Sequence, residues 1–83
     1  MSKILVEVSV PVAQTSFDAF LPLELAGYEA LALLVKLASD STGGLFVADE
    51  GTALCRREDG TILDIQLPVW KMGLGNGAKL MLV

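Results

Sequence analysis

The sequence predicts one small α+β domain spanning residues 1–83, in which a helix packs across a mixed β-sheet. Three observations predict this class. Apolar residues alternate at every second position near the start, they change to a helical spacing in the middle, and a glycine-rich turn precedes a final apolar run. A chain of 83 residues has room for one domain, which would bury roughly 60–65% of its unfolded surface.

The first strand is predicted over residues 4–10, because β-branched residues recur at every second position and share one face. The residues on this face are Ile4, Val6, Val8 and Val10. Pro11 cannot donate a ladder hydrogen bond, so it lies near the end of the strand. One side of the strand is therefore expected to be buried.

A second strand is predicted over residues 15–21, after a turn at residues 12–15. Its inward-facing residues are Phe17, Ala19 and Leu21. Phe20 falls on the opposite side and is expected to point outward, and Pro22 ends the strand. The two strands are expected to form an antiparallel hairpin.

A helix is predicted from about residue 26 to residue 40, followed by a stop at residues 39–44 that contains two glycines. Its core-facing stripe has the i, i+3, i+4, i+7 spacing and consists of Leu31, Leu34, Val35 and Ala38. Leu33 and Leu37 lie beside this stripe. The helix is therefore apolar over more of its circumference than packing on one side requires.

A second hairpin is predicted from strands at residues 52–56 and 61–63, joined by an Asp-Gly turn at residues 58–60. Strand alternation allows either Leu54 or Cys55 to face the core. A small buried hydrophobe is the expected role of Cys55, the only cysteine.

Three segments complete the chain. Residues 45–50 allow either a short strand or a packed loop, and residues 64–72 are expected to form an irregular crossover. A glycine-rich turn at residues 73–79 then leads into a last strand at residues 80–83. The resulting order, β-β-α-β-β-β, is that of a β-grasp fold whose final strand enters the middle of the sheet.

With this order in place, the chain resembles the stand-alone ubiquitin-like proteins of the YukD/EsaB type, encoded with type VII secretion systems in Gram-positive bacteria. The segments that carry the resemblance are Phe17–Pro22, Leu54–Leu63 and Met72–Leu80. It implies a ubiquitin-like β-grasp fold and a cytoplasmic, non-enzymatic accessory protein. Such a protein acts by non-covalent protein–protein interaction with the membrane-associated ATPase, other secretion components or substrates. Recruitment to the inner face of the membrane and a homo-oligomer both fit this role.

Two alternatives stay open. Residues 63–69, followed by Gly73, Leu74 and Asn76, are similar to the N-terminal ubiquitin-like domain of tether proteins carrying a UBX domain, which implies ATPase recruitment. Ubiquitin-type modifiers and sulfur carriers instead continue past the last strand into a Gly-Gly tail. Because the sequence stops at Val83 without that tail, we expect non-covalent binding rather than covalent transfer.

A catalytic, cofactor or metal site is not expected. The sequence has no histidine, so the commonest general base and most zinc sites are absent. Cys55 has no histidine to activate it, and the neighbouring Arg56 and Arg57 could lower its pKa only if it were exposed. The net charge is −4 and the six basic residues look scattered, which disfavours nucleic acid as a partner. No uncharged run approaches the roughly 20 residues that a membrane span requires.

Four apolar residues are candidates for a protein-interaction surface: Phe20, Leu33, Leu37 and Trp70. The apolar fraction of 53% is high for so short a chain, and either a dense core or a partner surface explains it. Tryptophan is enriched among binding anchors, although Trp70 could instead cover one end of the core.

Overall fold

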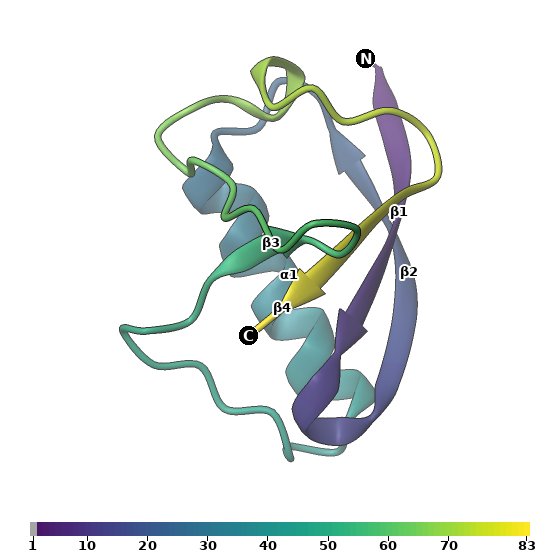
Figure 1. The fold of residues 1–83 in the computed structure, drawn as a ribbon, viewed down its shortest axis with the longest axis vertical. Helices are drawn as coiled ribbons and strands as arrows, with labels where there is room; N and C mark the ends of the chain where they lie inside the picture. The colour runs from purple at the N-terminus through teal and green to yellow at the C-terminus, as the bar shows by residue number, and fades with distance from the viewer. Residues whose placement is uncertain (1) are drawn as a thin grey trace.

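The computed structural model describes residues 2–83, in which a four-stranded mixed sheet carries one long helix across one face (Figure 1). The elements are β1 (Lys3–Val10), β2 (Thr15–Pro22), α1 (Gly27–Ser41), β3 (Leu54–Arg56) and β4 (Ala78–Leu82), with short 3-10 turns η1 (Pro11–Ala13) and η2 (Val69–Lys71). The strand order is β2-β1-β4-β3, and β4 runs parallel to β1 in the middle of the sheet. The β-grasp prediction is confirmed.

The core lies between the sheet and α1, where the inward-facing residues of the strands meet the helix. All four β1 residues predicted to face inward are buried, and so are Ala19 and Leu21 of β2. The helix contributes Ala30, Leu34 and Ala38, while Phe17, Leu31 and Val35 are partly buried and pack against this core. Full burial of one large apolar side chain stabilises the fold by roughly 1.5–3 kcal/mol.

The start of α1 is fixed by close packing against the crossover. The Gly27 N–H donates to the Leu67 carbonyl at 2.8 Å, and the Ala26 N–H is capped by the Glu29 carboxylate at 3.1 Å. A Cβ atom at position 27 would lie 2.6 Å from the Cα of Ile65, so only glycine fits here. The crossover therefore packs directly on the first turn of the helix.

The glycine-rich segment before β4 is a turn attached to β1. The Asn76 side chain accepts the Leu5 N–H at 2.8 Å, and the Gly77 N–H donates to the Leu5 carbonyl at 2.8 Å. Gly77 has a φ of 82°, in the left-handed region that favours glycine. This turn sets the register of β4 against β1.

The predicted return strand at residues 61–63 is wrong in its extent, because only an isolated bridge joins Ile62 to Cys55. Leu63 turns into the core, and the Asp64 carboxylate then accepts the Gln66 N–H at 2.9 Å. This local hydrogen bond bends the chain away before a strand can extend.

Residues 45–50 form a packed loop and not a strand. Phe46 is buried and anchors this loop, and its N–H donates to the Thr42 hydroxyl at 3.0 Å.

The register of β3 against β4 determines which side of β3 faces the core: Leu54 pairs with the inward-facing Leu82 and joins the core. Cys55 is buried as expected, but on the other side of the sheet, where it pairs with Met81.

Within residues 2–83, no helix combines the length and apolar character needed to cross a membrane. With 15 residues, α1 is about 22 Å long, whereas a hydrocarbon layer is about 30 Å thick.

Candidate protein-interaction surfaces

Phe20 and Trp70 are exposed near the same end of the sheet. Phe20 points outward from β2, is 56% exposed and pairs across the strands with Leu5. Trp70 is 60% exposed on η2, and its backbone N–H donates to the Leu23 carbonyl just beyond β2. A lysine ammonium lies over each ring: Lys3 Nζ is 4.8 Å from the Phe20 ring centroid, and Lys71 Nζ is 5.1 Å from the Trp70 ring centroid. Both sites combine apolar surface with positive charge.

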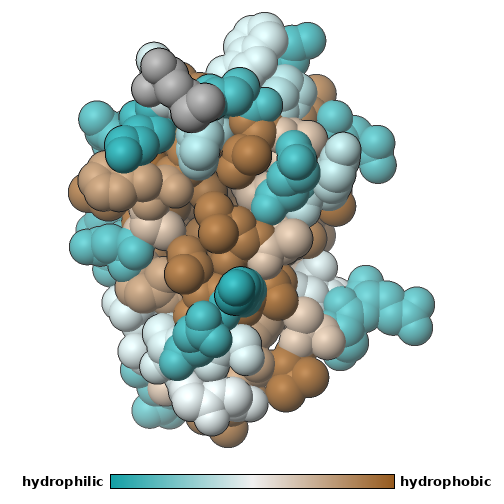
Figure 2. Space-filling model, turned by 180° about the vertical axis from the view of Figure 1, so that it is seen from behind, coloured by the Kyte–Doolittle hydropathy of each residue, from teal (hydrophilic) through white to brown (hydrophobic). Residues whose placement is uncertain are grey.

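Leu33 and Leu37 lie elsewhere, on α1, where both are half-buried and pack against the core. Figure 2 views the molecule from behind, the side of the sheet on which α1 lies, and shows apolar side chains gathered down the middle of this face. The four candidate residues therefore do not form one surface. Phe20 and Trp70 are exposed beside the sheet, whereas Leu33 and Leu37 expose only part of their surface on the helix side.

A row of charged side chains crosses the outer face of the sheet. Register places Glu7 of β1 beside Asp18 of β2 on one side and Lys79 of β4 on the other. Arg57 follows next, since its backbone N–H donates to the Lys79 carbonyl at 3.0 Å. The Arg57 guanidinium donates to the Ser9 hydroxyl at 2.6 Å and lies 3.4 Å from Glu7. The row is negative toward β2 and positive toward β3.

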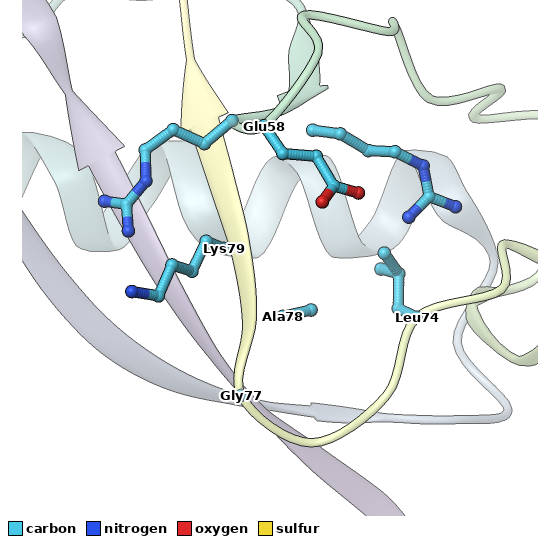
Figure 3. A pocket seen from close by; sticks show the side chains of 7 residues that line it. Glu58, Leu74, Gly77, Ala78 and Lys79 are labelled. Carbon is cyan, nitrogen blue, oxygen red and sulfur yellow. The ribbon is translucent and has the colours of Figure 1, made fainter.

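The positive end of this row opens into a cavity of about 600 Å³, here called the cationic cavity. It is lined by Arg56, Arg57, Glu58, Leu74, Gly77, Ala78 and Lys79. Figure 3 shows Glu58 reaching into the middle of these side chains, with Lys79 to one side and Leu74 to the other. Three of the six basic residues of the chain therefore meet at one place.

The two guanidinium groups of the cavity are held in position, but the three cations are incompletely neutralised. Arg56 donates through Nη2 to the Met72 carbonyl at 2.5 Å, which fixes its guanidinium at the cavity wall. Among residues 2–83 the only ion pair joins Arg57 to Glu7, so Arg56, Lys79 and Glu58 have none. Guanidinium groups held in this way can bind a carboxylate or another small anion.

The turn after the cavity carries a stable negative charge. The Thr61 N–H donates to the Asp59 carboxylate at 2.9 Å. Hydrogen bonds from the Thr61 backbone and side chain hold the pKa of Asp59 below its usual range. Asp59 is therefore ionised at neutral pH, so the cavity has an acidic neighbour.

A second concavity, of about 610 Å³, lies at the other end of β4 and is here called the apolar groove. It is lined by Pro11, Val12, Leu45, Phe46, Val47, Asp49, Gly51, Thr52, Leu82 and Val83. Val12, Leu45, Val47 and Val83 are each at least half exposed. Exposed apolar side chains that gather in one place are typical of contact surfaces.

Neither concavity was identified from the sequence alone. Arg56 and Arg57 are more than 20 residues from Lys79, and the pairing of β3 with β4 brings them together. The apolar groove depends on the loop at residues 45–50, whose structure the sequence left undecided. Within residues 2–83, no three His, Cys, Asp or Glu side chains gather where they could hold a metal ion.

No family model matches this sequence, and no curated protein sequence matches it either. Solved structures do match. The ubiquitin-like domain of the Mycobacterium tuberculosis type VII secretion protein EccD1 is 18% identical, with a TM-score of 0.78 over 100% of this chain and 99% of that one. The EccD5 ubiquitin-like domain from Mycobacterium xenopi is 20% identical, with a TM-score of 0.81 over 100% and 94%.

Two further structures show how widely the fold is used. A chain of the MycP5-free ESX-5 inner membrane complex is 17% identical, with a TM-score of 0.70 over 98% of this chain and 20% of that one. A chain of the toluene 4-monooxygenase HD complex is 12% identical, with a TM-score of 0.76 over 99% and 98%. The fold of this chain is therefore ubiquitin-like, and at these identities the likeness shows the fold alone.

Proposed function

We propose that this chain is a non-enzymatic, ubiquitin-like accessory protein of a bacterial type VII secretion system that binds other proteins non-covalently. The observation that carries the proposal is the match to two EccD ubiquitin-like domains, each covered over at least 94% of its own length. The sequence resemblance to the YukD/EsaB type points independently to the same secretion systems.

The exposed side chains support binding rather than chemistry. Phe20 and Trp70 each offer an aromatic ring with an adjacent lysine, a combination suited to a hot spot in an interface. The sequence contains no histidine, and Cys55 is buried. We propose the secretion ATPase, or another component of the apparatus, as the partner, with the chain acting in the cytoplasm at the inner face of the membrane.

A second candidate function follows from the likeness to a chain of the toluene 4-monooxygenase HD complex. In that case this chain would be a structural component of an enzyme assembly and would bind a catalytic subunit. Covalent transfer, as in modifiers and sulfur carriers, is a third candidate. The first two candidates predict different co-purifying partners, and covalent transfer predicts a changed mass of the chain.

Co-purification tests the proposal. The affinity-tagged chain is expressed with the cytosolic parts of secretion components from the same genome, and the complexes are separated by size-exclusion chromatography. We expect co-elution with one component, an unchanged mass of the chain on denaturation, and loss of co-elution for Phe20→Asp combined with Trp70→Ser.

Ala32→Asp is the matched control, since it introduces the same charge at an exposed position of α1 that lines neither concavity. A monooxygenase subunit as the co-eluting protein would contradict the proposal. So would an adduct at the C-terminus, or failure of every secretion component to co-elute.

A further inference from the structure

The positive charge of this acidic chain is concentrated in the cationic cavity. Three cations and one carboxylate line the cavity, which leaves a charge of +2 there. Because the whole chain carries −4, the remaining residues carry −6. Clustered basic residues on an acidic protein are poorly explained by solubility, which any distribution of charge would provide.

The side chains around the cavity do not neutralise this charge. Within residues 2–83, Glu58 makes no ion pair although it lies among the three cations, and Arg57 has only its 3.4 Å contact with Glu7. Lys79 is exposed and adjoins the cavity from β4, one of the two middle strands of the sheet. An anion in the cavity would therefore gain new contacts without displacing a strong internal pair.

The cavity also has apolar surface. Leu74 and Ala78 are half-buried, pack against the core and line one side. Arg56 is held at this side by its hydrogen bond to the Met72 carbonyl. A ligand that suits both features has a carboxylate for the cations and a short apolar side chain for Leu74 and Ala78.

We propose that the cationic cavity binds an acidic peptide segment of a partner protein, in which one or two carboxylates lie beside an apolar residue. This inference rests on the proposed binding function and specifies the chemistry of the partner. Carboxylates of the segment pair with Arg56, Arg57 and Lys79, while its apolar side chain packs on Leu74. Glu58 limits how much negative charge the cavity accepts.

A short peptide fits better than an extended polyanion. Nucleic acid or an anionic membrane would cover a wider area and would meet Glu7 and Asp18 on the outer face and Asp59 on the adjoining turn. These carboxylates surround the cavity on two sides and would repel a long negative surface. A segment with two carboxylates can lie within the cavity and avoid them.

Fluorescence anisotropy tests the proposal with a labelled peptide that carries two carboxylates, acetyl-Leu-Asp-Glu-Leu-amide, and its neutral analogue, acetyl-Leu-Asn-Gln-Leu-amide. We expect the acidic peptide to bind, the neutral analogue not to bind, and binding to weaken as salt rises. Lys79→Glu should weaken binding about tenfold, because an attraction is replaced by a repulsion. Leu74→Asp should weaken it as well.

Lys36→Glu is the matched control, since it makes the same charge change at an exposed helix position away from the cavity. We expect its affinity to stay within about twofold of wild type. Equal weakening by Lys36→Glu and Lys79→Glu would show a response to net charge alone and overturn the proposal. Circular dichroism establishes that each variant is folded before binding is measured.

Three outcomes separate the competing explanations. Tighter binding of duplex DNA or of phosphatidylserine vesicles than of the peptide, lost in Lys79→Glu, would replace the peptide with a polyanion and overturn the proposal. No binding of the acidic peptide would also overturn it. Peptide binding needs no secretion component, so a positive peptide result with failed co-purification would count against the secretion role alone.

Discussion

The cationic cavity and the apolar groove have nearly the same volume, about 600 and 610 Å³, but opposite chemistry. Both are built on β4: Ala78 and Lys79 at its start line the first, and Leu82 at its end lines the second. The comparison teaches that one central strand can present two unlike surfaces. Volume alone does not identify a partner; the lining side chains do.

The two concavities also differ in how their walls are held. The cationic cavity is bounded by the paired strands β3 and β4 and by guanidinium hydrogen bonds to Met72 and Ser9. The groove has a wall made of the loop after α1, which is held by buried Phe46 and by local bonds such as that from the Asp49 N–H to the Thr52 hydroxyl. We therefore expect the cavity to be the more rigid of the two.

The variant with the largest expected effect disrupts the apolar groove and leaves the cationic cavity intact. Phe46→Ala removes the buried anchor of the loop and should lower the free energy of unfolding by about 3–5 kcal/mol. Urea denaturation measures the loss. Val47→Ala, at a neighbouring residue that is 77% exposed, is the control and should cost less than about 0.5 kcal/mol. Similar costs for both variants would show that Phe46 does not anchor the loop.

The variant with the next largest expected effect weakens the wall of the cationic cavity. Arg56→Ala removes the donor to the Met72 carbonyl and should lower the free energy of unfolding by about 1–2 kcal/mol. Arg57→Ala is the comparison, because its ion pair with Glu7 is partly exposed and should contribute about 0–1 kcal/mol. A larger loss for Arg57→Ala in the same denaturation series would reverse this ranking.

The smallest effect concerns the turn beside the cavity. The pKa of Asp59 is lowered in the folded state, so Asp59 stabilises the fold above its ordinary pKa of 3.8. This contribution is lost as the pH falls through the folded pKa. Asp59→Asn should therefore lower the melting temperature slightly at pH 7 and leave it unchanged near about pH 2. A difference that grows on acidification would contradict this assignment.

Much of the fold could be predicted because it depends on local patterns. Alternation identified the buried face of β1, helical spacing identified Leu34 and Ala38, and the glycines before β4 marked a turn. The return strand at residues 61–63 could not be predicted correctly. The hydrogen bond from the Gln66 N–H to Asp64 competes with strand pairing, and the sequence does not show which prevails.

The candidate sites were harder to predict because they depend on long-range register. Exposure of Phe20 followed from alternation, and Trp70 is exposed as a contact residue would be. Leu33 and Leu37 have the helical spacing of an exposed flank, but both pack against the core. The basic residues looked scattered along the chain, and only the β3–β4 pairing shows that three of them share a cavity.

Deletion of the gene in its native host tests the proposed function most directly. Secretion of type VII substrates into the medium is measured by quantitative mass spectrometry, with complementation by wild type, Lys79→Glu and Lys36→Glu. We expect secretion to fall on deletion, to recover with wild type and Lys36→Glu, and to stay low with Lys79→Glu. Unchanged secretion in the deletion strain would contradict a role for this chain in type VII secretion.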